Sequence, residues 1–151
     1  MENGNYEKKG YLLEDFRLFH LRGAQGVKAE FHYHEFCKLL LLVSGTGGYT
    51  VEGQRYALRP GDIVLVGSRA VHRPEFDPNA PYERIIVYID PEFLRQNSTE
   101  DCDLLEIFSG KAGHVLRSGK HFELFGQASD LEQILESDRL ARETVRKLSK
   151  I

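Results

Sequence analysis

The sequence has few cysteines, no long hydrophobic run and no surplus of basic residues. Its two cysteines, Cys37 and Cys102, are too few for a disulfide framework and lack metal-knuckle spacing, which indicates a reducing cytoplasm. The longest aliphatic run, over residues 39–43, is far shorter than the roughly 20 residues of a membrane-spanning helix, so no membrane partner is expected. Residues 1–10 are polar and lack the apolar core of a signal peptide.

Several binding and catalytic patterns are also missing. The net charge of −3 provides no basic surplus to neutralise phosphates, so this chain alone is not expected to bind nucleic acid. There is no glycine-rich phosphate loop and no nucleophile-elbow pattern. Cys37 and Lys38 are neighbours on a predicted strand, so their side chains face opposite ways. These features argue against nucleophilic catalysis.

What is present is the composition of an ordinary folded protein. The 151 residues are 41% hydrophobic and 28% charged, which fits one globular domain. At Arg59-Pro60-Gly61-Asp62 a tight turn is predicted, because proline presets one φ and glycine allows the next to be positive. Strands are predicted over residues 11–21, 31–43, 46–52, 54–58, 63–66 and 84–89. Short strands at close intervals predict a mostly β fold, either a sandwich or a barrel.

Helical signals replace strand signals after residue 89. Asp90 is placed to cap a helix that begins at Pro91. A second short helix is predicted from residue 98 or 99 through 108, and a strand over 114–117. From residue 118 apolar residues recur at helical spacing, with a further helix beginning near Asp138. The apolar residues are Phe122, Phe125, Leu131, Ile134 and Leu135 in the first helix, then Leu140, Val145, Leu148 and Ile151 in the second.

The predicted organisation is a barrel over residues 1–117, with a loose arm over 1–10, followed by a helical segment over 118–151. The apolar end of the last helix has little else to cover it, so we expect a homodimer through this segment. The earlier apolar residues of the segment could simply pack on the barrel. No capping residue precedes Ile151, which favours a piece of a longer protein over a frayed natural terminus.

Three histidines and a lysine form the pattern that carries chemistry. Alternate residues of a strand share a face, so His32, His34 and Lys38 would point to the same side. Two short strands joined near Pro60 would bring His72 opposite the first two histidines. If this side faces the inside of a barrel, imidazoles and an amine converge there.

This pattern resembles the two motifs of the cupin superfamily. The positions of the first motif hold Gly26, His32, His34, Lys38 and Gly45. The positions of the second hold Gly61, Gly67, Arg69, His72 and Phe76. All three histidines are present, but Lys38 stands where the family has a metal-ligating glutamate, and the Pro-x-Gly elbow and final asparagine are replaced. The resemblance implies a double-stranded β-helix, which is a jelly-roll barrel.

A narrower resemblance covers most of the chain. The segments "VSGTGGYTVEGQRYALRPGDIVLV" and "ERIIVYIDPEFL", with His-x-His before them, resemble the N-terminal sensor domain of AraC-type bacterial transcription regulators. That resemblance implies a jelly-roll barrel that binds a small-molecule effector, followed by C-terminal α-helices that pair two subunits. It also implies a DNA-binding domain, which this chain lacks.

Two functions follow as hypotheses. The first is an effector-binding and dimerisation domain without enzymatic activity or a cofactor. Its predicted ligand contacts are His32, His34, Lys38, Arg69, His72, Arg17 and Tyr49. The alternative is a stand-alone metal-dependent cupin enzyme, of the isomerase or dioxygenase type, with His32, His34 and His72 as metal ligands.

Lys38 argues against the metal and for an anionic or polyhydroxylated effector. An ammonium about 4 Å from a doubly charged ion would cost roughly 8 kcal/mol at an effective dielectric constant of about 20. If Lys38 faces inward, it needs a counter-charge or an anionic ligand, and Arg17 and Arg69 would favour the same ligand class. A kink after His34 could instead turn Lys38 to solvent and bring Cys37 and the odd-numbered leucines inward. The histidines could be satisfied by neighbours, and Arg69 could be a solvated loop residue.

Overall fold

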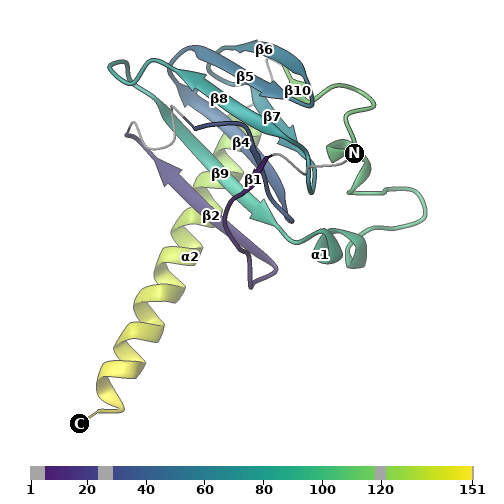
Figure 1. The fold of residues 1–151 in the computed structure, drawn as a ribbon. Helices are drawn as coiled ribbons and strands as arrows, with labels where there is room; N and C mark the ends of the chain where they lie inside the picture. The colour runs from purple at the N-terminus through teal and green to yellow at the C-terminus, as the bar shows by residue number, and fades with distance from the viewer. Residues whose placement is uncertain (1–5, 24–28, 118–121, 151) are drawn as a thin grey trace. The chain divides into compact units, whose positions relative to one another are not determined.

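The computed structural model describes residues 6–23, 29–117 and 122–150. The chain divides into two compact units, residues 1–119 and 120–151 (Figure 1). The first unit consists mostly of strands, and the second is a single helix. No helix in the described ranges is long and apolar enough to cross a membrane.

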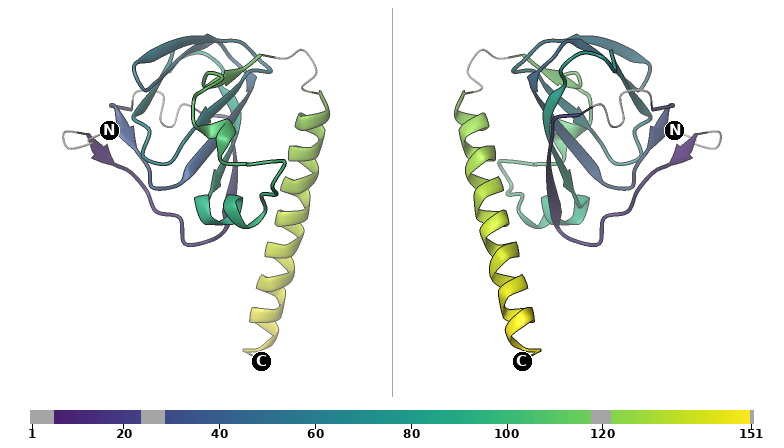
Figure 2. Two further views of the ribbon diagram at one scale, coloured as in Figure 1. Left: turned by 90° about the vertical axis from the view of Figure 1, so that its right-hand side faces the viewer. Right: turned by 90° about the vertical axis from the view of Figure 1, so that its left-hand side faces the viewer.

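The first unit is built from two five-stranded sheets that curve round a common core (Figure 2). In the first sheet the order is β1 (Glu7–Lys8), β3 (His32–Tyr33), β8 (His72–Phe76), β5 (Gly47–Val51) and β6 (Gln54–Leu58). In the second sheet the order is β10 (Val115–Leu116), β7 (Ile63–Val66), β4 (Cys37–Ser44), β9 (Glu83–Ile89) and β2 (Phe16–Leu21). The predicted mostly β, jelly-roll fold is confirmed.

Side chains from both sheets meet in the core. Leu40 and Leu42 of β4 pack in one cluster with Tyr49 and Val51 of β5. These four side chains are almost completely buried, and burial of each one stabilises the fold by about 1.5–3 kcal/mol. The predicted turn after β6 is present, and Gly61 has the positive φ of 93° that the proline-glycine pair requires. The strand predictions over residues 54–58 and 63–66 are confirmed without change.

The predicted strand over residues 31–43 is in fact two strands, β3 and β4. The break lies where the chain leaves one sheet for the other, because β3 pairs with β8 whereas β4 pairs with β7 and β9. Two hydrogen bonds hold the crossing in place. The Arg69 N–H donates to the carbonyl of His34 at 2.6 Å, and the Ser68 hydroxyl donates to the carbonyl of Glu35 at 2.8 Å.

Two further strand predictions need correction. The strand predicted from residue 11 begins only at Phe16, which pairs with Ile89 at the end of β9. Helix α1 starts directly afterwards, so residues 11–15 have no strand to pair with. Strand β8 was not predicted, because Pro74 lies at its centre. That position is tolerated because β3 pairs with β8 only at His32 and His72, so Pro74 has β5 as its one neighbouring strand.

The short helices follow the prediction in part. Helix α1 (Pro91–Gln96) begins as predicted, and the Asp90 carboxylate accepts the Glu92 N–H at 3.1 Å. The helix predicted to end at residue 108 is only one 3-10 turn, η1 (Glu106–Phe108). In the strand predicted over 114–117, only β10 forms.

The second unit is one continuous helix, α2 (Phe122–Leu148), where two helices were predicted. Asp138 does not start a new helix. Its carboxylate instead pairs with Arg142 one turn later at 2.9 Å, and Arg139 pairs with both Glu136 and Glu143 across the predicted boundary. The predicted apolar residues Phe122, Phe125 and Ile151 lie outside the described side chains.

The two cysteines lie in contrasting surroundings. Cys37 is only 1% exposed and faces the opposite side of β4 from Lys38, whereas Cys102 is exposed. Burial raises the pKa of the Cys37 thiol. Both cysteines are free thiols.

Candidate functional site

A cavity of about 290 Å³ opens inside the barrel of the first unit. Both sheets and the N-terminal segment contribute to its wall. The polar and charged side chains in the wall are Lys9, His32, His34, Lys38, Tyr49, Tyr82, Arg84 and Tyr88, and the apolar ones include Leu21, Leu40 and Ile86. The volume is near the lower end of the range for small-molecule pockets.

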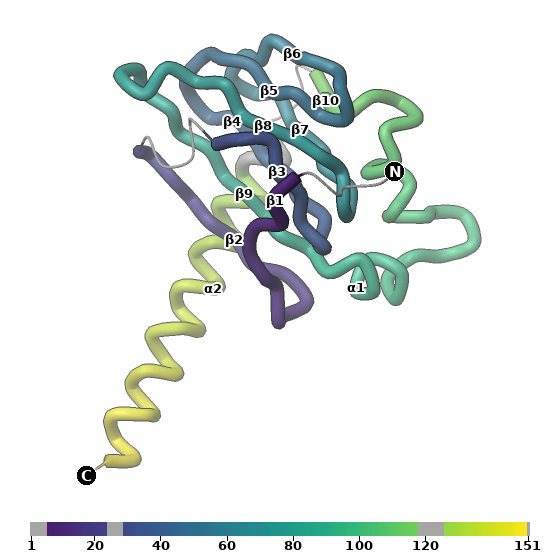
Figure 3. The backbone as a smooth tube through the Cα atoms, in the orientation of Figure 1, coloured from purple at the N-terminus to yellow at the C-terminus, as the bar shows by residue number. Residues whose placement is uncertain are grey.

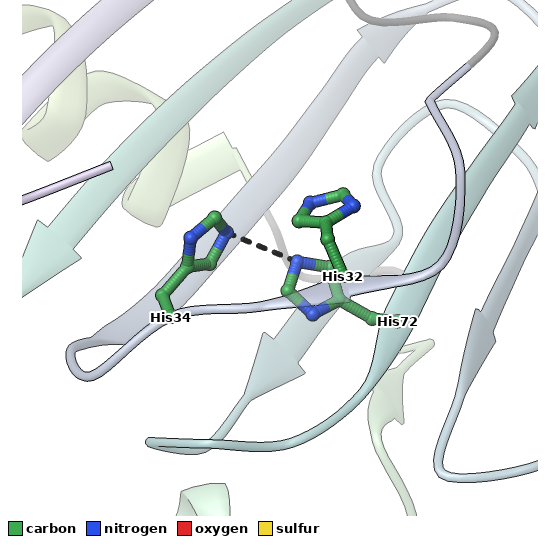
Figure 4. Close-up of side chains that lie close together, drawn as sticks. All are labelled: His32, His34 and His72. Carbon is green, nitrogen blue, oxygen red and sulfur yellow. Dashed lines mark hydrogen bonds between the residues drawn. The ribbon is translucent and has the colours of Figure 1, made fainter. Parts of the chain in front are cut away.

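The three predicted histidines lie close together (Figure 4), and His32 and His34 line this cavity. His32 lies on β3 directly opposite His72 on β8, and His34 follows two residues after His32. All three are buried, and one ring nitrogen from each lies within 4.8 Å of the others. The Nε2 atoms of His34 and His72 are 3.1 Å apart. Strand alternation therefore predicted this cluster correctly.

Each histidine ring is oriented by a backbone carbonyl. The Nδ1 atoms of His32, His34 and His72 face the carbonyl oxygens of Glu30, Lys9 and Ala70 at 2.7, 2.5 and 2.9 Å. A carbonyl oxygen only accepts, so each Nδ1 carries the proton, and the Nε2 lone pairs of His34 and His72 face each other. Burial lowers the pKa of His34 to about 4 and lowers the pKa of the other two rings. At neutral pH the rings are uncharged, and a cation placed between the Nε2 lone pairs of His34 and His72 would relieve their mutual repulsion.

The donor set only partly fits the metal ion that the histidines suggest. A neutral imidazole whose other nitrogen donates to a carbonyl is the form that binds divalent metals. Three such imidazoles are present, but no aspartate or glutamate lines the described cavity wall to supply a negative charge. Lys38 stands in that wall instead, so the site provides nitrogen ligands beside a positive charge.

Lys38 faces the cavity, and the alternative that a kink turns it to solvent is wrong. Its side chain points to the same side of β4 as Leu40, and only 7% of it is exposed. The ammonium donates a hydrogen bond to the Tyr49 hydroxyl at 2.8 Å. Burial, with a smaller contribution from Arg84, lowers the pKa of Lys38 to about 8. Burial also raises the pKa of Tyr49 far above its ordinary value.

Arg84 is a cavity residue that the sequence interpretation did not select. It is 2% exposed, and its guanidinium lies 4.0 Å from the centre of the Tyr82 ring. It donates to the carbonyls of Gly23 and Tyr82. Strand alternation could have revealed it. Arg84, Ile86 and Tyr88 are two residues apart on β9, so they share the face that lines the cavity.

Three of the seven predicted contacts do not line this cavity: His72, which instead faces the His34 ring, and the two arginines. Arg17 is exposed on β2, with its guanidinium 5.0 Å from the Phe19 ring centre. Arg69 lies in the turn between β7 and β8, with a left-handed φ of 67°. It lines a separate open hollow of about 620 Å³ with His114 and Ser109. The ligand roles of Arg17 and Arg69 stay predictions that the cavity does not support.

The N-terminal segment runs beside β3 (Figure 3), and two of its residues line the cavity. Strand β1 pairs in parallel with β3, and the Lys9 N–H donates to the carbonyl of Tyr33 at 2.9 Å. Lys9 and Gly10 line the cavity, and the Lys9 carbonyl accepts the ring proton of His34. Within the arm predicted over residues 1–10, the part from β1 to Gly10 is therefore held against the barrel. Residues 1–5 lie outside the described range.

Comparison with known proteins gives one family and several solved structures. The family described as AraC-like ligand binding domain matches residues 15–145. A cupin-like protein from Thermotoga maritima is 20% identical with a TM-score of 0.45, over 52% of this chain and 60% of its own. A Ralstonia eutropha protein, provisionally assigned as a mannose-6-phosphate isomerase, is 24% identical with a TM-score of 0.41, over 52% and 80%. A Bacillus subtilis oxalate decarboxylase variant is 18% identical with a TM-score of 0.42, over 60% and 24%.

Proposed function

The chain belongs to the family of AraC-like ligand-binding domains, and from this premise we propose that its barrel is the sensor of a bacterial transcription regulator. The observation that carries the proposal is the cavity of about 290 Å³ inside the barrel. Polar groups from β3, β4 and β5 converge on it, and the N-terminal segment borders its mouth. A small-molecule effector would bind there, and the domain itself would carry out no reaction.

The wall has the composition that ligand sites share. Such sites are concave and mainly apolar, with a few precisely placed polar groups. Leu40 and Ile86 give apolar surface, while Lys38, Tyr49 and His34 present polar groups whose positions are fixed by hydrogen bonds. We assign effector contacts to the predicted residues His32, His34, Lys38 and Tyr49, with His72 supporting the ring of His34.

Thermal unfolding of the whole chain with a panel of sugars, carboxylates and phosphates tests this proposal. A ligand at 100 times its Kd should stabilise the fold by about 2.7 kcal/mol. Ala29→Phe, which adds a ring at the half-buried edge of the cavity, should abolish the shift. Lys111→Met, an exposed change, should preserve it. A shift that survives Ala29→Phe would place the ligand elsewhere, and a panel with no shift would contradict the proposal.

We further propose that α2 pairs with α2 of a second copy. Ile134, Ala141, Val145 and Leu148 follow one another at steps of seven, four and three residues, which is the spacing of a coiled-coil seam. Ile134, Val145 and Leu148 are 65%, 66% and 61% exposed. In the intact regulator, the paired sensors would position attached DNA-binding domains, and the reading frame beyond Ile151 tests that part directly.

Sedimentation of matched charge variants tests the homodimer. Val145→Glu puts a carboxylate into the proposed seam and should give a monomer at concentrations where the wild type is a dimer. Thr144→Glu adds the same charge beside the seam and should leave the dimer in place. A monomeric wild type, or equal effects of both variants, would contradict this role of α2.

A metal-dependent cupin enzyme is the second candidate, and the orientation of the histidine rings favours it. All three Nδ1 protons are held by carbonyls, which leaves three Nε2 lone pairs for a divalent ion. His32, His34 and His72 would hold the ion, and it would supply Lewis-acid chemistry. Titration with Co²⁺, followed by its visible absorption, should then give one ion per chain and should fail in His72→Ala. No binding at millimolar Co²⁺ would remove this candidate.

A further inference from the structure

We infer that the cavity takes a small organic anion, whose charged group binds at Lys38 and Tyr49 while its apolar body lies against Leu40, Ile86 and Tyr88. This inference rests on the proposed function, since it names the class of ligand that the sensor would recognise.

The cavity wall is charged with one sign only. Lys9, Lys38 and Arg84 line it, and no aspartate or glutamate is among its described lining residues. The ion pairs found among the described residues do not include Lys38. Burying an ammonium without a counter-charge lowers the stability of the fold. A protein keeps such a group where its charge is needed to bind a ligand. Arg84 adds a second positive charge, and its electrostatic effect lowers the pKa of both Lys38 and Tyr49.

The hydrogen-bonding groups at Lys38 match a group that only accepts. An ammonium has three donors, and the hydrogen bond to Tyr49 uses one of them. The Tyr49 hydroxyl accepts from Lys38 and therefore keeps its own proton for donation. A carboxylate or phosphate oxygen can accept from both groups and neutralise the charge at the same time. A neutral hydroxyl could form the hydrogen bonds, but it would leave the ammonium uncompensated.

The remaining wall defines the body of the ligand. Leu40, Ile86 and Leu21 give an apolar surface, and the Tyr88 ring adds an aromatic one. A volume of about 290 Å³ suits one ring or a short chain rather than a large cofactor. The space therefore suits the predicted class of anionic effector. Arg84 provides the arginine charge at the cavity that was predicted for Arg17 and Arg69.

Calorimetry at pH 7 with matched anionic and neutral probes tests the inference on the whole chain. The anions are benzoate, hexanoate and phenyl phosphate, and the neutral counterparts are benzamide and hexanamide. Because an anion accepts charge-assisted hydrogen bonds that its neutral counterpart cannot form, the best anion should bind at least about 10-fold more tightly than that counterpart. Lys38→Met should weaken the anion by a similar factor, whereas Lys111→Met should leave its Kd within about 2-fold.

The possible outcomes separate this inference from the proposed function. Preference for phenyl phosphate over benzoate would assign a phosphate headgroup, and the reverse a carboxylate. Neutral probes that bind as tightly as the anions would overturn the inference and leave the sensor function intact. Anion binding that Lys38→Met does not change would overturn the assigned site. A chain that binds no probe at 10 mM would count against both.

Discussion

Replacing Lys38 with methionine should make the ligand-free barrel more stable. The Lys38 ammonium is buried, and its pKa lies at about 8 instead of 10.5. At 1.36 kcal/mol for each factor of ten, keeping this charge in the folded state at pH 7 costs about 3 kcal/mol. Methionine has a similar length and no charge, but it leaves the buried Tyr49 hydroxyl without its partner, which offsets about 1 kcal/mol. We expect a net gain of about 2 kcal/mol.

The gain should depend on pH with a definite sign. Below pH 8 the lysine is charged in both the folded and the unfolded chain, so the full cost is present. Between pH 8 and pH 10.5 the unfolded chain binds more protons than the folded one, and the wild type gains stability relative to the variant. The advantage of Lys38→Met should therefore shrink by about 2 kcal/mol between pH 7 and about pH 9.5.

Urea unfolding followed by circular dichroism measures both quantities. Lys111→Met makes the same substitution at an exposed lysine and should change the free energy of unfolding by less than about 0.5 kcal/mol at either pH. A destabilised Lys38→Met variant, or a difference that stays constant with pH, would show that the ammonium is solvated or paired in the fold. The electrostatic basis of the proposed anion site would then be lost.

Four other substitutions test further parts of the structure. Tyr49→Phe removes a hydrogen bond to an ammonium and should destabilise the wild type by about 1.5–3 kcal/mol at pH 7. Its effect should be smaller in a Lys38→Met background, and a double-mutant cycle in urea measures this coupling. Gly67→Ala would place a Cβ 2.6 Å from the Phe108 carbonyl oxygen and should destabilise the fold by about 1–3 kcal/mol. Gly126→Ala meets open space in α2 and should stabilise that helix by up to about 1 kcal/mol. Thermal unfolding of the two variants should therefore show opposite shifts. Asp62→Ala removes the acceptor of the Arg59 N–H at 2.9 Å and should lower the unfolding free energy by about 1 kcal/mol, and an unchanged urea midpoint would contradict the turn geometry.

The histidine cluster was predictable because local chain geometry determines most of it. His32 and His34 are two residues apart, so extended backbone carries both to one side. The turn at Pro60 and Gly61 leads from β6 into β7 of the second sheet, and the next turn, over residues 67–71, returns the chain to the first sheet, where His72 pairs directly with His32. The same local rules identified β6, β7 and the start of α1, where turn and capping residues are unambiguous.

The orientation of Lys38 and the role of Arg84 depend on pairing between distant strands. A break in a strand can shift the alternation by one residue, so the sequence left both orientations of Lys38 open. The pairing of Lys38 with Tyr88, and of Leu40 with Ile86, fixes which side chains share the cavity. In α2, Ser137 and Asp138 suit a helix start as well as a helix interior, and the ion pair to Arg142 decides between them only once the helix is formed.

The contrast between the two thiols gives the chain an internal probe of its own motions. Cys102 is exposed and should react with an alkylating reagent at the rate of a free thiol, whereas Cys37 can react only when the sheet around it opens. The ratio of the two rates therefore reports the opening equilibrium of β4 in the unmodified chain, with Cys102 as the reference in the same tube. Because Lys38 is the next residue on that strand, ligand capture in the cavity should register as slower alkylation on the opposite face of the sheet.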